Sequence, residues 1–411
     1  MRPSTIRVLS ITKRALLIGA ITFALTEAVL QVLINTNTLK LNGVLEHPNI
    51  SKEYFQNYLN KRDPQLGWPS ELAHGQLFNS EGYRPSPEAA KHKTKEPCVA
   101  VFGDSQGYGL DVSDAEAWTN VLAKKLNCKV ENYSVPAYGT DQAYLRFRKV
   151  SPRADTVILT FINDNLRRNL LQYWDLALGP INIERTKPRF ITDANGALRL
   201  IPLPVNSYDQ AEALNSWDFG SLFQHETFAP GSPIYRTAFQ PFFPYTFSLV
   251  KAAISSLATR NSEAIWVKHG PLARLVDRRI NQGESIANPK TIDLQKAIFQ
   301  EFIKTCKNLD KNCLIISLQP AFADPKLEAI SLTRLAFESN PRIRAHIISG
   351  QFLAQCMHVN LLGQGLDKSS LDRRMPGGHY GPETNKAIGE CLAFELSAHR
   401  LNAKKIYGIE R

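Results

Sequence analysis

The apolar positions of the first 35 residues form one unbroken run instead of a repeating pattern. The run covers residues 15–34, and its length of about 20 residues is what a helix needs to cross a bilayer. Glu27 is the one charged residue inside it. The basic residues before the run place the amino terminus in the cytoplasm and the rest of the chain outside it; they are Arg2, Arg7, Lys13 and Arg14.

Two interpretations of this run compete. A signal peptide would use the shorter core 15–25 and be cut near Ala28. A retained single-span anchor is favoured, because residues 29–34 continue the apolar run beyond that cleavage site. Glu27 weighs against the anchor, since a carboxylate near the centre of a bilayer costs about 2.5 kcal/mol or more.

From residue 98 onward, short apolar runs alternate with segments that have the apolar spacing of helices. The alternation predicts an α/β fold with a parallel sheet that is covered by helices on both faces. The predicted strands are 98–102, 129–135, 156–162, 314–318 and 357–362. The predicted helices are 115–126, 142–149, a long helix that includes 297–304, then 342–354 and 384–398.

The remaining segments complete the expected domain organisation. Residues 1–35 form the membrane anchor, 36–96 a proline-broken lead-in with a helix near 52–61, and 97–400 the main domain. An insertion at about 176–285, rich in Pro, Phe and Tyr, interrupts the alternation. It is interpreted either as a lid or wall for substrate, or as an aromatic cluster that only packs.

The net charge of +11 is typical of proteins that bind one of three partners: nucleic acid, an anionic membrane surface or an acidic polysaccharide. No stripe of Lys and Arg interleaved with aromatic residues is present, so nucleic acid is not expected as a partner. A basic but unspecialised solvated surface remains the simplest alternative.

Six cysteines fit a compartment outside the cytoplasm, where disulfides form. Six allow fifteen connectivities. Cys98 and Cys128 each open a predicted strand, and Cys306 and Cys313 flank a short polar turn, which leaves Cys356 and Cys391. Position therefore suggests these three pairs, with six buried free thiols as the alternative. No Cys or His cluster has the spacing of a metal site, and no metal or cofactor is expected.

Ser105 stands out among the serines because of its setting. It follows a short apolar run and lies in the turn Gly103-Asp104-Ser105-Gln106-Gly107. Ligand sites of parallel α/β sheets lie beyond the carboxyl ends of the strands. A serine there is exposed while the strand behind it fixes its backbone. The alternative is an ordinary strand-to-helix turn with serine as a cap.

Two further positions follow the next two predicted strands. Gly139 lacks a side chain, so its N–H group can approach a substrate oxygen closely. Asn163 supplies a side-chain amide donor for the same oxygen, a contact typically worth about 3 kcal/mol in the transition state. The alternatives are a turn glycine and a turn-capping asparagine.

In sequence order these motifs resemble those of the SGNH (GDSL-like) hydrolase family. The run Val101-Phe102-Gly103-Asp104-Ser105 resembles block I, Gly139 the block II glycine, Asn163-Asp164 block III and His379 the block V histidine. The resemblance spans residues 99–398. It implies a flavodoxin-like, three-layer α/β/α fold with strand order 2-1-3-4-5. It also implies ester hydrolysis or acyl transfer, with an oxyanion hole made by the N–H groups of Ser105 and Gly139 and the amide of Asn163. A weaker similarity, carried by residues 165–169 and 187–190, is to members linked to polysaccharide biosynthesis.

His379 is the expected general base for Ser105, since a serine hydroxyl is a poor nucleophile until a base takes its proton. The family usually carries an aspartate three residues before this histidine, and here that position is Pro376. Asp372 is the candidate orienting acid, with Asp367 further back in the chain. A backbone carbonyl could orient the ring instead. Loss of an orienting carboxylate can lower the rate by about 10⁴-fold.

Three functions fit these residues. The first is a serine esterase that removes acyl groups, such as acetyl, from a cell-surface or exported glycan or a small ester. The second is a polysaccharide O-acyltransferase, which needs a multi-span partner to carry the acyl donor across the membrane. The third is a non-catalytic glycan-binding or assembly factor. This function stays an alternative because Pro376 stands where the family usually has its orienting aspartate. All three place the main domain outside the cytoplasm, in the periplasm.

Overall fold

The chain folds into two compact units. The computed structural model describes residues 3–35, 49–68, 77–92, 96–174, 183–193, 195–215, 220–226, 244–247, 249–250, 289–318, 347–348, 353, 356 and 378–407. One unit comprises residues 1–55, 173–185 and 205–284. The other comprises residues 56–172, 186–204 and 285–411, and it contains the sheet.

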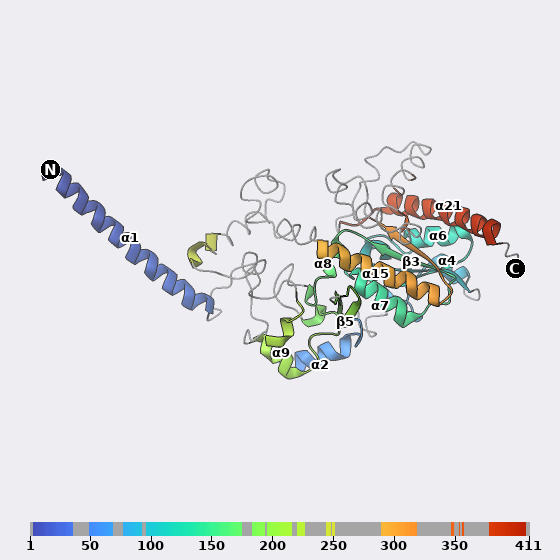
Figure 1. The fold of residues 1–411 in the computed structure, drawn as a ribbon, viewed down its shortest axis with the longest axis horizontal. Coiled ribbons are helices and arrows are strands. Elements are labelled where there is room, and N and C mark those ends of the chain that lie inside the picture. The colour runs from blue at the N-terminus through green and yellow to red at the C-terminus, as the bar shows by residue number, and fades with distance from the viewer. Residues whose placement is uncertain are drawn as a thin grey trace. The chain divides into compact units, whose positions relative to one another are not determined.

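A parallel sheet forms the centre of the second unit, as the alternation of strands and helices predicts (Figure 1). Its strands lie in the order β2-β1-β3-β6-β7, and every neighbouring pair is parallel. The central strands are buried along almost their whole length, which explains their continuous apolar sequences. The strands are β1 (Pro97–Phe102), β2 (Lys129–Asn132), β3 (Thr156–Phe161), β6 (Asn312–Ser317) and β7 (Ile347–Ile348).

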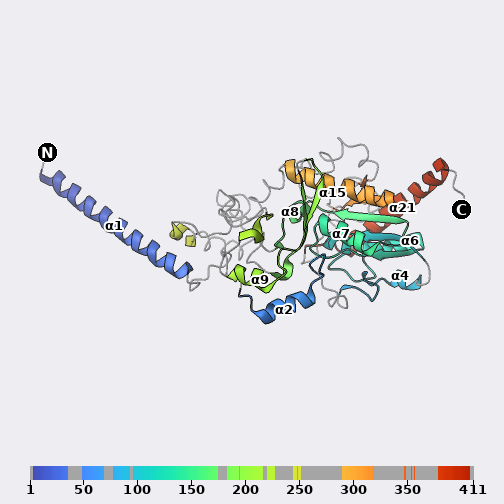
Figure 2. The same ribbon diagram turned by 60° about the horizontal axis from the view of Figure 1, so that its bottom comes forward.

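Helices cover both faces of this sheet (Figures 1 and 2). Trp118 and Leu122 of one helix and Ile388 of another pack on one face, in a core that includes Val101. On the other face Phe102 contacts Phe147, with ring centroids 5.5 Å apart. Val101 and Phe102, which are adjacent in β1, thus pack against helices on opposite faces of the sheet. The helices are α6 (Trp118–Leu126) and α21 (Pro382–Tyr407) on the first face, and α7 (Thr140–Val150) and α15 (Pro289–Asn308) on the second.

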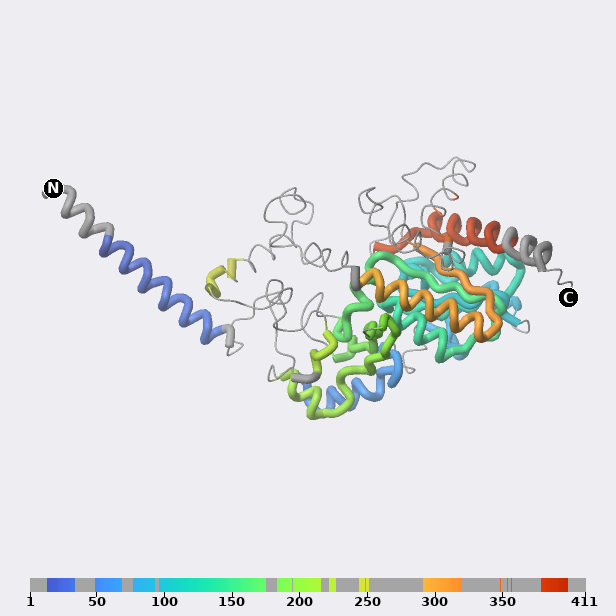
Figure 3. Tube along the Cα trace, in the orientation of Figure 1, coloured from blue at the N-terminus to red at the C-terminus, as the bar shows by residue number. Residues whose placement is uncertain are grey.

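Shorter elements occupy the predicted lead-in and insertion. The lead-in contains α2 (Lys52–Lys61), where a helix was expected, and α4 (Pro87–Lys91). Between β3 and α15 the chain, whose path Figure 3 traces, forms an antiparallel hairpin. The hairpin belongs to the same unit as the sheet. The hairpin strands are β4 (Arg189–Thr192) and β5 (Leu198–Ile201), and η3 (Ile183–Arg185), α9 (Tyr208–Asn215) and η4 (Gly220–Phe223) belong to the first unit.

The helix predicted over residues 342–354 is wrong at Ile347 and Ile348. These residues form β7, which pairs with β6 through Ile315 and Ile316. A short run of β-branched residues cannot be assigned to helix or strand by periodicity alone, and the free edge of β6 decides it. The strand predicted over 357–362 lies outside the described residues.

The cysteine pairing suggested by position is confirmed. The disulfides are Cys98–Cys128, Cys306–Cys313 and Cys356–Cys391. The first joins the starts of β1 and β2, and the second closes the turn between α15 and β6. All six cysteines are bonded, so the alternative of buried free thiols is wrong.

The apolar run at the start of the chain forms one helix, α1 (Pro3–Asn35). Its segment Lys13–Leu33 is long and apolar enough to span a membrane. Most of the described side chains in this segment are exposed, and Glu27 and Leu30 are the buried ones.

Candidate active site

Ser105 follows β1 at the carboxyl edge of the sheet and opens the short helix α5 (Ser105–Tyr108). Asp104 caps this helix, because its carboxylate accepts from the N–H groups of Gln106 at 2.9 Å and Gly107 at 3.3 Å. Asp104 is fully buried, and burial raises the pKa of its carboxyl group. The turn therefore holds Ser105 by side-chain contacts as well as by the strand behind it. Ser105 is only 6% exposed, so the expected exposure is wrong, because the residues of this short helix are all buried.

The glycines beside Ser105 are needed for packing against β3. A Cβ atom on Gly103 would lie 1.8 Å from Oγ1 of Thr160, and one on Gly107 would lie 2.3 Å from the same atom. Neither residue has a positive φ, whereas Gly109 does, at +79°. Close contact with a neighbouring strand therefore explains both glycines, and neither is required by a left-handed backbone.

His379 contacts an aspartate that sequence reasoning did not find. Its Nδ1 atom lies 2.8 Å from a carboxylate oxygen of Asp111, which is 268 residues away along the chain. The histidine side chain is 16% exposed and the aspartate side chain 27%. This contact directs the other ring nitrogen, Nε2, away from the carboxylate, which is the arrangement a general base requires.

A chain of hydrogen bonds joins the His379 loop to the Ser105 turn. Asn385, in the first turn of α21, donates to the carbonyl of Tyr380 at 2.9 Å and accepts from the N–H group of Trp118. The indole of Trp118 donates to the carbonyl oxygens of Gln106 at 3.2 Å and Gly107 at 3.1 Å. Among the described residues, no hydrogen bond joins Ser105 to His379 directly.

Arg84, from the lead-in segment, shapes the turn that carries Asp111. Its guanidinium is buried and donates to the carbonyl oxygens of Tyr108, Gly109 and Val112, the last at 2.7 Å. Asp111 has φ = 70°, a left-handed conformation that few residues other than glycine adopt. The three carbonyl contacts on either side of Asp111 hold this backbone in place.

Arg168 connects the loops that follow β1, β2 and β3. Its guanidinium lies 3.6 Å from the carboxylate of Asp104, donates to Asp164 at 2.8 Å and donates to the carbonyl of Tyr138 at 3.0 Å. Burial opposes ionisation of Asp164, but Arg168 and Arg167 outweigh it and lower the pKa of its carboxyl group. The loops after β1, β2 and β3, which carry the motifs predicted from the sequence, therefore meet around the guanidinium of Arg168.

Gly139 and Asn163 lie at the ends of the second and third of these loops. The N–H group of Gly139 faces Oε1 of Gln142 at 3.4 Å, a long contact that a better acceptor could replace. A Cβ atom on Gly139 would lie 2.4 Å from the Asp141 carboxylate, so packing alone requires glycine here. Asn163 precedes α8 (Asp164–Arg168), and its half-buried side chain makes no capping hydrogen bond to that helix.

A buried ion pair lies beneath Gly139. Lys187 donates to the carboxylate of Asp141, and neither side chain is exposed. Asp141 also accepts from the N–H group of Gln142, and its own N–H group donates to Asn169 at 3.2 Å. Residues 187–190 carry part of the weaker family similarity described above. Lys187 of this segment thus supports the loop that carries Gly139.

The structure therefore places Ser105, Gly139, Asn163 and His379 in loops that are linked by hydrogen bonds. Asp372 and Asp367, the predicted orienting acids, lie outside the described residues. Asp111 occupies the position at His379 that they were expected to take. The one sequence signal for Asp111 is that aspartate tolerates a left-handed turn. Such aspartates are too common for this signal to identify Asp111.

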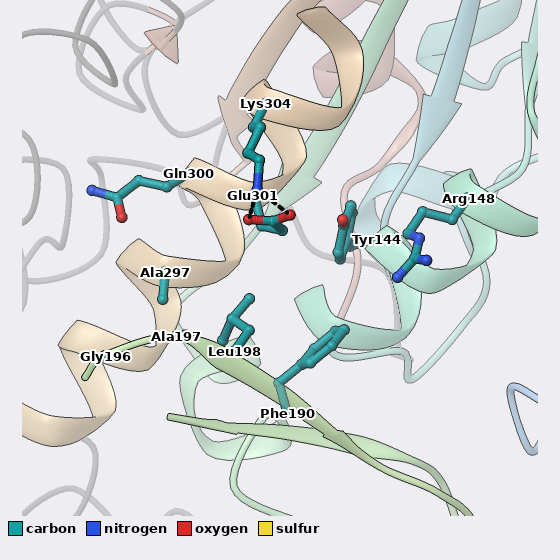
Figure 4. A pocket seen from close by; sticks show the side chains of 10 residues that line it. All are labelled: Tyr144, Arg148, Phe190, Gly196, Ala197, Leu198, Ala297, Gln300, Glu301 and Lys304. Carbon is teal, nitrogen blue, oxygen red and sulfur yellow. Dashed lines mark hydrogen bonds and ion pairs between the residues drawn. The ribbon is translucent and has the colours of Figure 1, made fainter. Parts of the chain in front are cut away.

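A groove of about 320 Å³ lies elsewhere in this unit, between α7, α15 and the β4–β5 hairpin (Figure 4). The rings of Tyr144 and Phe190 line it, together with Arg148 and the ion pair of Glu301 with Lys304 at 3.2 Å. It includes none of the candidate catalytic residues. Among the described residues, no group of three or more His, Cys, Asp or Glu side chains could hold a metal ion.

Comparisons with known proteins gave few matches. No family model matches the sequence, and no curated protein matches it. One solved structure that is similar is described as "Structure of a putative lipolytic protein of G-D-S-L family from Desulfitobacterium hafniense DCB-2". The match covers 72% of this chain and 97% of that chain, with 8% identity and a TM-score of 0.31. A similarity of this extent leaves the function to be inferred from the geometry of the site.

Proposed function

We propose that the chain is a membrane-anchored serine esterase of the SGNH type. The contact between His379 and Asp111 carries this proposal, because it supplies the orienting carboxylate that Pro376 removes from the usual position. The strand order β2-β1-β3-β6-β7 supports it, since the family resemblance implies this order. An orienting acid favours catalysis over a non-catalytic binding factor.

The proposed reaction starts with attack of the Ser105 hydroxyl oxygen on the acyl carbon of an ester. Nε2 of His379 takes the hydroxyl proton, and Asp111 stabilises the imidazolium that forms. The negative charge on the carbonyl oxygen is held by the N–H groups of Ser105 and Gly139 and by the amide of Asn163. When the intermediate collapses, the leaving alcohol takes the proton from Nε2.

The second half of the reaction releases the acid. Water attacks the acyl group on Ser105 and gives its proton to His379, and the Ser105 oxygen takes that proton back as the carboxylic acid leaves. In an acyltransferase, a sugar hydroxyl would replace the water. Both reactions use the same residues, so the acceptor decides between them.

The proposed substrate is an acyl ester, acetyl above all, on a cell-surface or exported glycan. The net charge of +11 supports an acidic glycan or a membrane surface as the setting. The basic residues before α1 support a single span with its amino terminus in the cytoplasm. Three disulfides support a location outside the cytoplasm, in the periplasm.

The test is hydrolysis of nitrophenyl acetate by the full-length chain in detergent, compared with Ser105→Ala and with a control, Ser113→Ala. Ser105→Ala is expected to lose the activity. The control is expected to keep it, because the exposed hydroxyl of Ser113 donates to Glu116 and the substitution leaves the backbone bonds of Ser113 in place. Unchanged hydrolysis in Ser105→Ala would remove Ser105 from the mechanism. Adding an acetyl-free oligosaccharide acceptor then shows whether acetate passes to sugar or to water.

A further inference from the structure

Glu27 is buried in a helix whose apolar side chains are exposed. It is 4% exposed, whereas Leu25 is 63% exposed. Leu30, one turn further along the same face of α1, is also buried. The face of α1 that carries Glu27 and Leu30 is therefore covered by another part of the same unit.

The residues that cover Glu27 come from a segment more than 200 residues away. The backbone N–H groups of Tyr245 and Thr246 both donate to the Glu27 carboxylate, the second at 2.9 Å. The N–H group of Phe247 donates to the carbonyl of Pro244 at 3.0 Å, so these residues form one turn. Both Glu27 oxygens thus accept backbone hydrogen bonds.

The depth of this contact follows from the geometry of the helix. Glu27 precedes Leu33, the last residue of the apolar segment, by six residues, which corresponds to about 9 Å along the helix axis. Interfacial segments bury their apolar faces about 5–10 Å into the boundary between headgroups and acyl chains. The contact therefore lies at the depth of such segments.

At this depth, hydrogen bonding between the Glu27 carboxylate and the backbone N–H groups of the turn is favourable for both partners. A carboxylate inside a bilayer is costly when it is alone, and a free backbone N–H group is costly there too. Hydrogen bonds to an ionised acceptor are among the stronger ones in proteins. Glu27 and the turn at residues 244–247 therefore satisfy each other where water is scarce.

The segment also presents apolar side chains outward. Phe247 is 44% exposed and Val250 is 55% exposed. Together with Glu27 they point to the bilayer as the surface that covers them, because the exposed side chains of α1 beside them need the same environment.

We propose that residues 244–247, with Leu249 and Val250, form a second membrane-seated element, held against the anchor helix by Glu27. This inference rests on the proposal that α1 spans a bilayer. It assigns Glu27, which weighed against an anchor in the sequence, to a stabilising contact. The protein then holds the membrane at two places, the anchor helix and the turn at residues 244–247.

The experiment places a nitroxide label on the full-length chain in vesicles of phosphatidylcholine and phosphatidylglycerol. All six native cysteines are in disulfides, so an introduced cysteine takes the label. The labelled variants are Phe247→Cys, with Leu25→Cys as the lipid control and Asp209→Cys, exposed on α9, as the water control. Collision rates with oxygen and with a water-soluble nickel chelate report the depth of each label.

The proposal expects Phe247→Cys to resemble Leu25→Cys, with an oxygen-to-nickel collision ratio several-fold above that of Asp209→Cys. Adding Glu27→Ala is expected to move the Phe247→Cys label toward the water control. A label at 247 that resembles Asp209→Cys overturns the inference while leaving the anchor intact. A label that stays lipid-like in Glu27→Ala overturns the role of Glu27. A water-like label at Leu25→Cys overturns the anchor itself.

Discussion

Two pairs of a carboxylate with a nitrogen base lie in the candidate site, and they differ in their access to water. Lys187 and Asp141 are entirely buried beneath Gly139. His379 and Asp111 keep 16% and 27% of their side chains exposed. Loss of either partner of the buried pair would leave an unpaired buried charge, whereas the partly exposed imidazole is open to solvent. The first pair is therefore suited to holding a loop, and the second to catalysis.

The largest expected effect separates these two roles at Asp111. Asp111→Asn should lower kcat for nitrophenyl acetate by about 10⁴-fold, since an amide favours the wrong imidazole tautomer. Asparagine tolerates the left-handed backbone of this residue, so the thermal midpoint should hardly change. Steady-state kinetics and a melting curve measure both.

The matched control is Glu96→Gln, which neutralises an exposed carboxylate that pairs with Arg153. It should leave kcat unchanged. Equal rates for Asp111→Asn and the control would mean that Asp111 does not orient the base.

The next effect is one of stability and falls on the buried pair. Lys187→Met leaves the Asp141 carboxylate buried and unpaired, which should lower the free energy of unfolding by about 3–5 kcal/mol. Lys304→Met breaks the exposed pair with Glu301 and should change it by about 0–1 kcal/mol. Urea denaturation compares the two. Similar values for both variants would contradict a structural role for Lys187.

A smaller effect is expected at Arg84, which acts through the turn at Asp111. Arg84→Lys keeps the charge but loses the planar fork that contacts three carbonyl groups. Displacement of Asp111 should then lower kcat by about 10²-fold, with little change in KM. Arg153→Lys, at an exposed arginine, is the control. A fall in apparent kcat that equals the fraction of unfolded protein, measured by circular dichroism, would argue against positioning.

The smallest effect concerns Asp164 and acid. Its folded pKa is lowered, so its contribution to stability is present above the ordinary carboxyl value of about 3.9 and is lost as the pH falls through the folded pKa. The difference in unfolding free energy between the wild type and Asp164→Asn should therefore shrink below about pH 4. A difference that stays constant on acidification would mean that Arg168 does not favour the charged form.

The sequence predicted those parts of the fold that depend on neighbours in the chain. The first four predicted strands and the helix at Lys52–Lys61 follow local periodicity, and the structure has a strand or helix at each of these places, with the second strand ending at Asn132. The strand at Ile347–Ile348 was missed because the adjacent edge of β6 decides it.

The candidate site shows the same division. Ser105 and His379 were predicted because each lies in a distinctive turn beside a strand or helix. Asp111 and Arg84 were missed, since the first contacts a residue 268 positions away and the second comes from a segment with little periodicity. Long-range contacts between irregular segments leave no local pattern to find.

The central claim is that Ser105 is the nucleophile and His379, oriented by Asp111, is its base. The most direct measurement is the site of reaction with a fluorophosphonate, mapped by mass spectrometry on the full-length chain. We expect one adduct, on Ser105, formed rapidly in the wild type and much more slowly in Asp111→Asn and His379→Ala. An adduct on another residue, or equal rates in all three proteins, would contradict the claim.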